Sequence, residues 1–80
     1  MTRVVFPEHL LQYTGGVREL DVTVSDVRSL LLFLEARFPG CERALARSAI
    51  AIDGQIHQDA YLEPLGKAEE VFFMQRIEGG

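Results

Sequence analysis

Eighty residues are enough for one small domain with a single core, and too few for an enzyme with a deep cleft of its own. Hydrophobic residues make up 48% of the chain and charged residues 25%, which is the composition of a folded globular protein. The formal charge is −4 and no run of basic residues interrupts the sequence, so we expect no nucleic-acid partner. The longest apolar run, 30–34, is far shorter than the ~20 residues that cross a bilayer. With a single cysteine as well, the sequence predicts a cytoplasmic protein that does not associate with membranes.

The first quarter of the chain predicts two strands joined by a hairpin. Residues 2–6 are β-branched and aromatic, and they stop at Pro7, which cannot donate to a strand ladder. Residues 17–24 alternate between polar and apolar positions, as in a half-buried strand. The segment between them contains Gly15 and Gly16. Because it lacks the strand and helix context of a phosphate-binding loop, we expect a hairpin loop there.

Residues 25–40 predict the main helix. Ser25 is the expected N-cap, Asp26 suits the positive end of the helix dipole, and Pro39-Gly40 supplies the stop. Leu32 falls opposite the apolar stripe, so it is either covered by the following segment or exposed. The stripe itself has helical spacing and consists of Val27, Leu30, Leu31, Leu34 and Phe38.

The second half of the chain predicts two further strands. Residues 48–53 form the third strand and end in the turn dipeptide Asp53-Gly54, and residues 70–75 form the fourth. The stretch 57–69 is irregular, with room for one helical turn. Strand, strand, helix, strand, strand is the order of an α+β domain: a mixed sheet of four to five strands with one main helix across one face. No linker or repeat divides residues 1–80, so we expect a single domain.

This element order and the ending Ile77-Glu78-Gly79-Gly80 resemble the ubiquitin-like β-grasp family. The similarity is greatest to its bacterial sulfur carriers, the MoaD/ThiS family, which comprises the small subunit of molybdopterin synthase and the thiamine sulfur carrier. Its specific parts are the Asp53-Gly54 turn, the pattern "PLGKAEEVFF" at 64–73, and the hydrophobic-x-Gly-Gly tail. The resemblance implies a β-grasp fold followed by a flexible tail at 76–80.

The resemblance also implies a chemistry for the terminus. In this family the last carboxylate, here that of Gly80, is adenylated by an ATP-using activating enzyme and converted to a thiocarboxylate that donates sulfur. Gly79 would help to thread the tail, since glycine has no side chain to collide with a narrow channel. The chain would be a carrier and not an enzyme, with no bound cofactor of its own and ATP held by the partner. The implied partners are an adenylating enzyme, a sulfur donor, and a molybdopterin synthase large subunit or thiazole synthase as acceptor.

Two other functions stay open on the sequence. An activated Gly80 could instead be joined to lysine side chains, as in ubiquitin, whose tail also has an arginine shortly before Gly-Gly, as Arg76 is here. Alternatively, the chain could be an interaction module whose terminus is never activated. The sequence alone does not name the final acceptor of the sulfur.

The strand at 70–75 offers a candidate partner surface. Strand alternation turns two of its apolar residues toward the helix, which leaves Phe72 and Met74 on the other side. Either residues 55–68 or Leu11 cover them, or they form an exposed patch that docks the activating enzyme or the acceptor. The expected partner-binding residues are Phe72, Met74, Arg76 and Ile77.

The remaining reactive side chains predict no further site. Cys41 follows the helix stop with no histidine nearby in sequence, so we interpret it as a small buried hydrophobe rather than a nucleophile. His9 and His57 are far apart, and no Cys, His or Asp residues have zinc-ligand spacing. We therefore predict no metal site.

Overall fold

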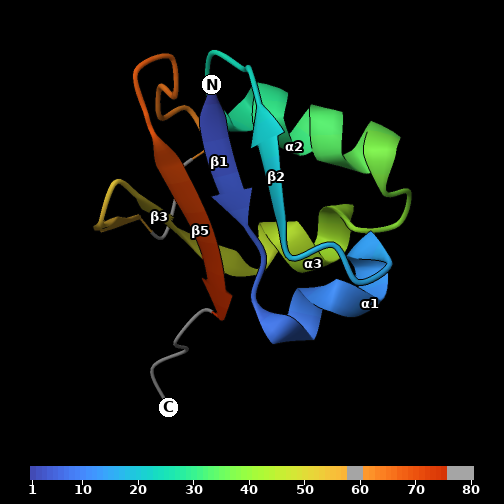
Figure 1. Ribbon diagram of the computed structural model, residues 1–80. Helices are drawn as coiled ribbons and strands as arrows, with labels where there is room; N and C mark the ends of the chain where they lie inside the picture. The colour runs from blue at the N-terminus through green and yellow to red at the C-terminus, as the bar shows by residue number, and fades with distance from the viewer. Residues whose placement is uncertain (58–60, 76–80) are drawn as a thin grey trace.

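A computed structural model of the chain describes residues 1–57 and 61–75 (Figure 1). Five strands form one sheet in the order β2-β1-β5-β3-β4. Only the β1–β5 pair is parallel among the pairings of this sheet, which makes the sheet mixed, as predicted. The strands are β1 Thr2–Val5, β2 Glu19–Val22, β3 Ser48–Ile52, β4 Gln55–His57 and β5 Glu70–Gln75. The helices are the 3₁₀ helix η1 Glu8–Leu10 and the α-helices α1 Leu11–Thr14, α2 Val27–Arg37 and α3 Glu42–Ala46.

The last strand lies at the centre of the sheet, between β1 and β3. Val71 is paired with Val4 of β1, and Phe73 with Ile50 of β3. Since directly opposed residues share a face, these four side chains point to the same side, where α2 and α3 lie (Figure 1). Val71 and Phe73 are almost completely buried, at 0% and 2% exposed. The predicted orientation of this strand is therefore confirmed.

Helix α2 lies where the sequence predicts it and covers this packed face of the sheet. Leu30 and Leu34 of the apolar stripe are fully buried, whereas Leu31 is only partly buried. Leu32 is 63% exposed, so the following segment does not cover it. The core also contains three phenylalanine rings: Phe6 stacks on Phe73 at 6.0 Å between centroids and meets Phe38 edge to face at 6.1 Å.

The N-cap of α2 is Asp26, so the assignment of this role to Ser25 is wrong by one residue. Asp26 Oδ1 accepts a hydrogen bond from the Ser29 backbone N–H at 2.7 Å. The Ser25 carbonyl accepts instead from the Leu65 N–H at 2.8 Å. Residues 25–27 pair with the distant segment 63–65, and Asp26 within this pairing has an extended backbone, so the helix begins after it.

The connection between β1 and β2 is helical, so the predicted hairpin loop is also wrong, although the two strands are antiparallel as expected. Leu10 is 1% exposed and belongs to the core, and this burial anchors η1 and α1. Gly15 then ends α1 with a φ of 66°, a left-handed conformation that glycine adopts without strain. Two apolar side chains in so short a segment are too few to show helical periodicity in the sequence.

Besides η1 and α1, two further short elements were not predicted, α3 and β4. The Asp53-Gly54 turn is confirmed: both residues have positive φ, 47° and 87°, and Ile52 is paired with Gln55 across it. Positive φ at both central residues is the requirement of a type I′ hairpin turn. Strand β4, which follows the turn, has only three residues, too few to show an alternation of polar and apolar positions.

Residues 61–69 contain no helix or strand, as the irregular sequence predicts. None of the described helices is long and apolar enough to span a membrane.

Candidate functional site at the C-terminal end of β5

The described part of the candidate site is the end of β5 and the surfaces around it. Phe72 and Met74 lie on this strand, which ends at Gln75. The other four predicted site residues lie outside the described residues, and they are Arg76, Ile77, Gly79 and Gly80.

Phe72 and Met74 lie on the open face of the sheet, opposite the face that packs against α2. Phe72 is 38% exposed and Met74 is partly buried. Pairing places Phe72 between Val5 of β1 and Ala51 of β3, and Ala51 is itself paired with Ile56 of β4. These four side chains form a row across four strands, and the pair Ala49–Met74 lies beside it on the same face. We call the whole group the open-face patch: Val5, Ala49, Ala51, Ile56, Phe72 and Met74.

Part of this patch was not predicted from the sequence. Ile56 is 62% exposed and extends the patch onto β4, a strand that was not predicted. Ala49 and Ala51 are 2% and 6% exposed, because the larger neighbouring side chains cover them. Among the described residues, neither 55–57 and 61–68 nor Leu11 fully covers Phe72, which is 38% exposed. The alternative in which the patch is exposed is therefore the correct one for Phe72 and holds only in part for Met74.

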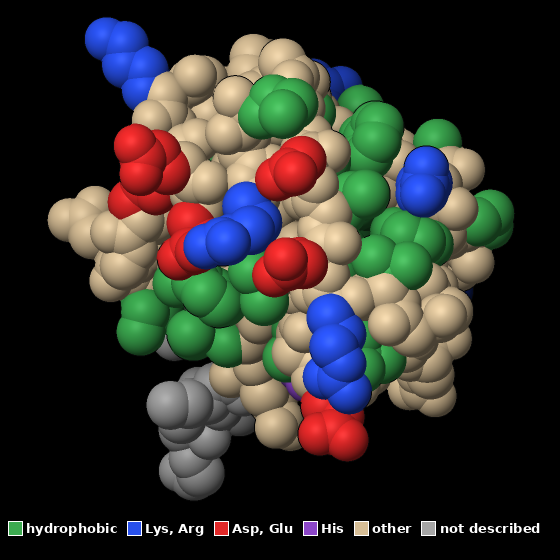
Figure 2. All heavy atoms as spheres, in the orientation of Figure 1, with side chains coloured by type: hydrophobic (Ala, Val, Ile, Leu, Met, Phe, Trp, Pro, Cys, Tyr) green, Lys and Arg blue, Asp and Glu red, His purple; other side chains and the backbone are tan. Residues whose placement is uncertain are grey.

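The other half of the open face is charged. Arg3 of β1 is paired with Asp21 of β2 on one side and Glu70 of β5 on the other, and Glu19 is paired with Val5. Figure 2 shows basic and acidic side chains interleaved over this part of the face, with hydrophobic side chains gathered directly below them. Arg3 donates to Glu70, and this hydrogen bond, together with the carboxylate's charge, raises the pKa of Arg3 further above its ordinary value. The open face therefore divides into a charged half and an apolar half.

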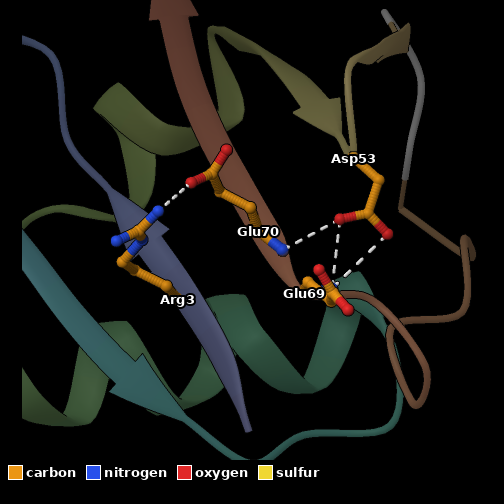
Figure 3. Close-up of polar contacts among 4 residues, drawn as sticks. All are labelled: Arg3, Asp53, Glu69 and Glu70. Atoms are coloured by element: carbon orange, nitrogen blue, oxygen red, sulfur yellow. Dashed lines mark hydrogen bonds and ion pairs between the residues drawn. The ribbon is translucent and has the colours of Figure 1, made fainter.

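The start of β5 is held by the side chain of Asp53, for which the sequence predicts only a place in a turn. Asp53 Oδ1 accepts hydrogen bonds from the backbone N–H groups of Glu69 at 3.1 Å and Glu70 at 2.9 Å (Figure 3). The Asp53 N–H donates in return to the Glu70 carbonyl at 3.0 Å. Since the β3–β4 turn thus binds the first residues of β5, it helps to set the register of the strand that ends at Gln75. A signal was present in the sequence, because aspartate in a turn often accepts backbone hydrogen bonds.

Cys41 is a core residue, as the sequence predicts. It is 2% exposed, and its Sγ lies 3.8 Å from Glu35 Oε2. Burial, and then the negative charge of Glu35, raises the pKa of the thiol above its ordinary value. A thiol held in its protonated form is a poor nucleophile, so this environment does not activate Cys41.

The described residues contain no cluster of metal-ligating side chains. Over residues 1–57 and 61–75, no group of three or more His, Cys, Asp or Glu side chains is placed to hold an ion. His57 lies 3.7 Å from one carboxylate, that of Glu63. His9 lies apart from it, on η1.

A mixed sheet with β1 and β5 paired in parallel at its centre and one main helix across one face defines the ubiquitin-like β-grasp fold, which confirms the predicted fold class. Several solved structures are similar, including the following two. One is CysO of Mycobacterium tuberculosis, described as an antigen, with a TM-score of 0.82 at 15% identity over 96% of this chain and all of that chain. The other is a chain of the Amycolatopsis orientalis BexX/CysO complex, with a TM-score of 0.83 at 15% identity over the whole of both chains. No protein-family model and no curated protein sequence matches this chain.

Proposed function

We propose that this chain is a sulfur carrier rather than an enzyme, and that Gly80 is the residue that carries the sulfur. The observation that supports this proposal best is the sequence Ile77-Glu78-Gly79-Gly80, which begins two residues after the end of β5 in a β-grasp domain. The CysO structures share this fold, and one of them is a complex with BexX. A β-grasp chain that assembles with a second protein is the arrangement that a carrier requires.

The chemistry starts from a carboxylate at Gly80, which is ionised at neutral pH since the reference pKa of a terminal carboxyl is roughly 3.3–3.7. One carboxylate oxygen attacks the α-phosphate of ATP, which releases pyrophosphate and leaves an acyl-adenylate. Sulfide from a donor then attacks the acyl carbon and displaces AMP, which gives a thiocarboxylate. The partner enzyme binds ATP and Gly79 lets the tail pass into its active site, while the chain itself binds no cofactor.

The open-face patch is the surface that we propose for docking the activating enzyme. Phe72 in the middle of β5 and Ile56 on β4 expose large apolar side chains on this face, and covering them would remove apolar area from water. Arg76 and Ile77, which follow β5 in sequence, are proposed to continue the contact. A partner seated there would hold the residues after Gln75 in one direction, toward its own active site.

The sulfur acceptor belongs to cofactor biosynthesis of the molybdopterin or thiamine type in this proposal. A molybdopterin synthase large subunit or a thiazole synthase is accordingly the second partner. The two types differ in which acceptor enzyme takes sulfur from the same thiocarboxylate. Incubation of the thiocarboxylated chain with each acceptor distinguishes them, because only the cognate pair returns the chain to its carboxylate form.

The deciding experiment is intact-mass spectrometry after incubation with a cognate adenylating enzyme, ATP and sulfide. We expect the chain to gain the mass difference of one oxygen replaced by sulfur, at Gly80. Deletion of Gly80, or addition of one residue after it, should abolish the change, since the reacting carboxylate is displaced by about 3.5 Å. Thermal unfolding of both variants should match that of the unaltered chain.

Three results would count against the proposal. If no adenylate or thiocarboxylate forms with any activating enzyme of the source organism, the carrier function fails. If the extended variant is modified as well as the unaltered chain, the reacting group is not the Gly80 carboxylate. If Gly80 is found joined to lysine side chains of other proteins, the chain is a protein modifier.

A further inference from the structure

A basic hollow of about 650 Å³ lies at the C-terminal end of β5. Arg43 of α3, Arg47 at its C-cap and His9 of η1 line it, together with Gln75, the last residue of the strand. Figure 1 shows α1 and α3 beside this end of the sheet. The hollow is thus next to the point where residues 76–80 begin, on the side of the sheet opposite the open-face patch.

The charge of the hollow is opposite to that of the domain. The chain has a formal charge of −4, yet two of its eight Lys and Arg residues line this one hollow and no acidic residue does, among the described residues. Ion pairs in residues 1–57 and 61–75 join Arg3 to Glu70 and His57 to Glu63. Arg43 and Arg47 take part in neither, and both are exposed.

The arrangement on α3 is not one that helix stability favours. Arg43 and Arg47 are four residues apart, so they lie on the same face of the helix and repel each other. Their position near the end of the helix, where the dipole is negative, compensates for part of this repulsion. The two guanidinium groups together therefore give this face of α3 a concentrated positive charge.

A second hollow, of about 540 Å³, lies at the opposite end of β5 and has the opposite charge. Asp21, Asp53, Glu69 and Glu70 line it, and Arg3 is its one basic side chain among the described residues. The two ends of a six-residue strand are roughly 17 Å apart. The domain therefore has a positive end beside residue 75 and a negative end beside residue 70, and a charged partner would approach the two ends differently.

We infer that the basic hollow receives acidic side chains of the adenylating enzyme, placed around the mouth of the channel that takes residues 76–80. This inference rests on the proposed function, because that enzyme must approach the end of β5. An Asp or Glu of the partner fits the planar fork of an arginine in a two-bond contact. Such ion pairs become stronger as the two surfaces exclude water, and they attract the partner before contact. The negative end of the domain, beside residue 70, is repelled by the same acidic side chains and therefore faces away from the enzyme.

The test compares charge reversals inside and outside the hollow. The Arg43→Glu/Arg47→Glu variant is compared with Arg28→Glu/Lys67→Glu, which changes the net charge equally at exposed positions away from the hollow. The rate of pyrophosphate release by the adenylating enzyme gives KM and kcat for each chain. We expect the first variant to raise KM on the order of tenfold and to leave kcat unchanged. The control should change KM much less.

Salt provides the second readout. Between 0.01 M and 0.15 M salt the Debye length falls from about 30 Å to about 8 Å, so the KM of the unaltered chain should rise and the difference from the reversed variant should shrink. The milder Arg43→Gln/Arg47→Gln variant should give an intermediate KM, and it keeps the test valid if the double reversal unfolds.

The outcomes separate the two proposals. Activation of the unaltered chain, with equal KM values for the hollow variants and the control, would overturn the inference and leave the carrier function standing. A decrease in kcat with KM unchanged would also overturn it, because the hollow would then act after binding. Absence of activation of the unaltered chain would refute the carrier function and this inference with it.

Discussion

The two faces of β5 differ although their residues alternate along the same six positions. Val71 and Phe73 are 0% and 2% exposed beneath α2, whereas Phe72, between them, is 38% exposed on the open face. The residue types are similar on both sides, so composition does not explain the difference. The packed face is covered by α2, whereas Phe72 on the open face is paired with Val5 and Ala51 within the sheet and remains partly accessible to water. The packed face therefore contributes more buried apolar area to stability, and the open face leaves Phe72 accessible.

The sharpest test of this comparison is a matched pair of phenylalanine truncations. Phe73→Ala should lower the free energy of unfolding by about 3–5 kcal/mol, because it removes a ring that stacks on Phe6 in the core. Phe72→Ala should cost about 1 kcal/mol or less, since water already reaches its ring. Urea denaturation followed by circular dichroism measures both values. Equal losses would mean that the two faces are equally packed.

The next test moves from the strand to the helix that covers it. Leu34→Ala should cost about 2–5 kcal/mol, because Leu34 is 0% exposed. Leu32→Ala, two residues away at 63% exposed, should change stability by about 0.5 kcal/mol or less. Leu31→Ala should fall between them, as its side chain is partly buried. If Leu32→Ala costs as much as Leu34→Ala, the helix has a second buried face.

A smaller loss of stability is expected from removing the N-cap of α2, the helix that covers the packed face. Asp26→Ala should lower the melting temperature and Ser25→Ala should have little effect, because the Asp26 side chain caps the helix. The hydrogen bonds from Ser29 lower the pKa of Asp26. This stabilisation is thus fully present above the pKa that the carboxyl has in the unfolded chain, and it is lost as the pH falls through the lower folded value.

Melting curves of the unaltered chain and Asp26→Ala between neutral and acid pH check this sign. The difference in melting temperature should narrow as the carboxyl is protonated. A difference that stays constant with pH would mean that the contribution of Asp26 does not depend on its charge.

The smallest effect on stability should come from charging the open face. Phe72→Glu should leave unfolding cooperative, because its carboxylate can remain in water, but it should weaken binding to the activating enzyme when the surface is desolvated. Titration calorimetry with the enzyme measures the affinity, and thermal unfolding is the control. A variant that binds as tightly as the unaltered chain would exclude the open-face patch as the docking surface. A variant that unfolds would show that Phe72 belongs to the core.

Much of the architecture could be read from hydrophobic periodicity. The helical stripe, the alternation in β5 and the Asp53-Gly54 turn each depend on neighbouring residues only, and all three were predicted. The element order then led to the β-grasp fold. The short elements η1, α1, α3 and β4 were not predicted, because three to five residues hold too few apolar positions to define a period.

Only the tertiary structure decided which residues far apart in the chain come into contact. Residues 25–27, which include the N-cap Asp26, pair with residues 63–65, and Asp53 anchors β5 because the β3–β4 turn lies beside residues 69 and 70. The open-face patch combines residues from four strands, and the basic hollow combines η1, α1, α3 and the ends of β3 and β5. The sequence by itself determined which residues prefer water and which avoid it, since that is a property of each side chain. Which of them meet is a property of the chain's path through space, and local patterns do not contain it.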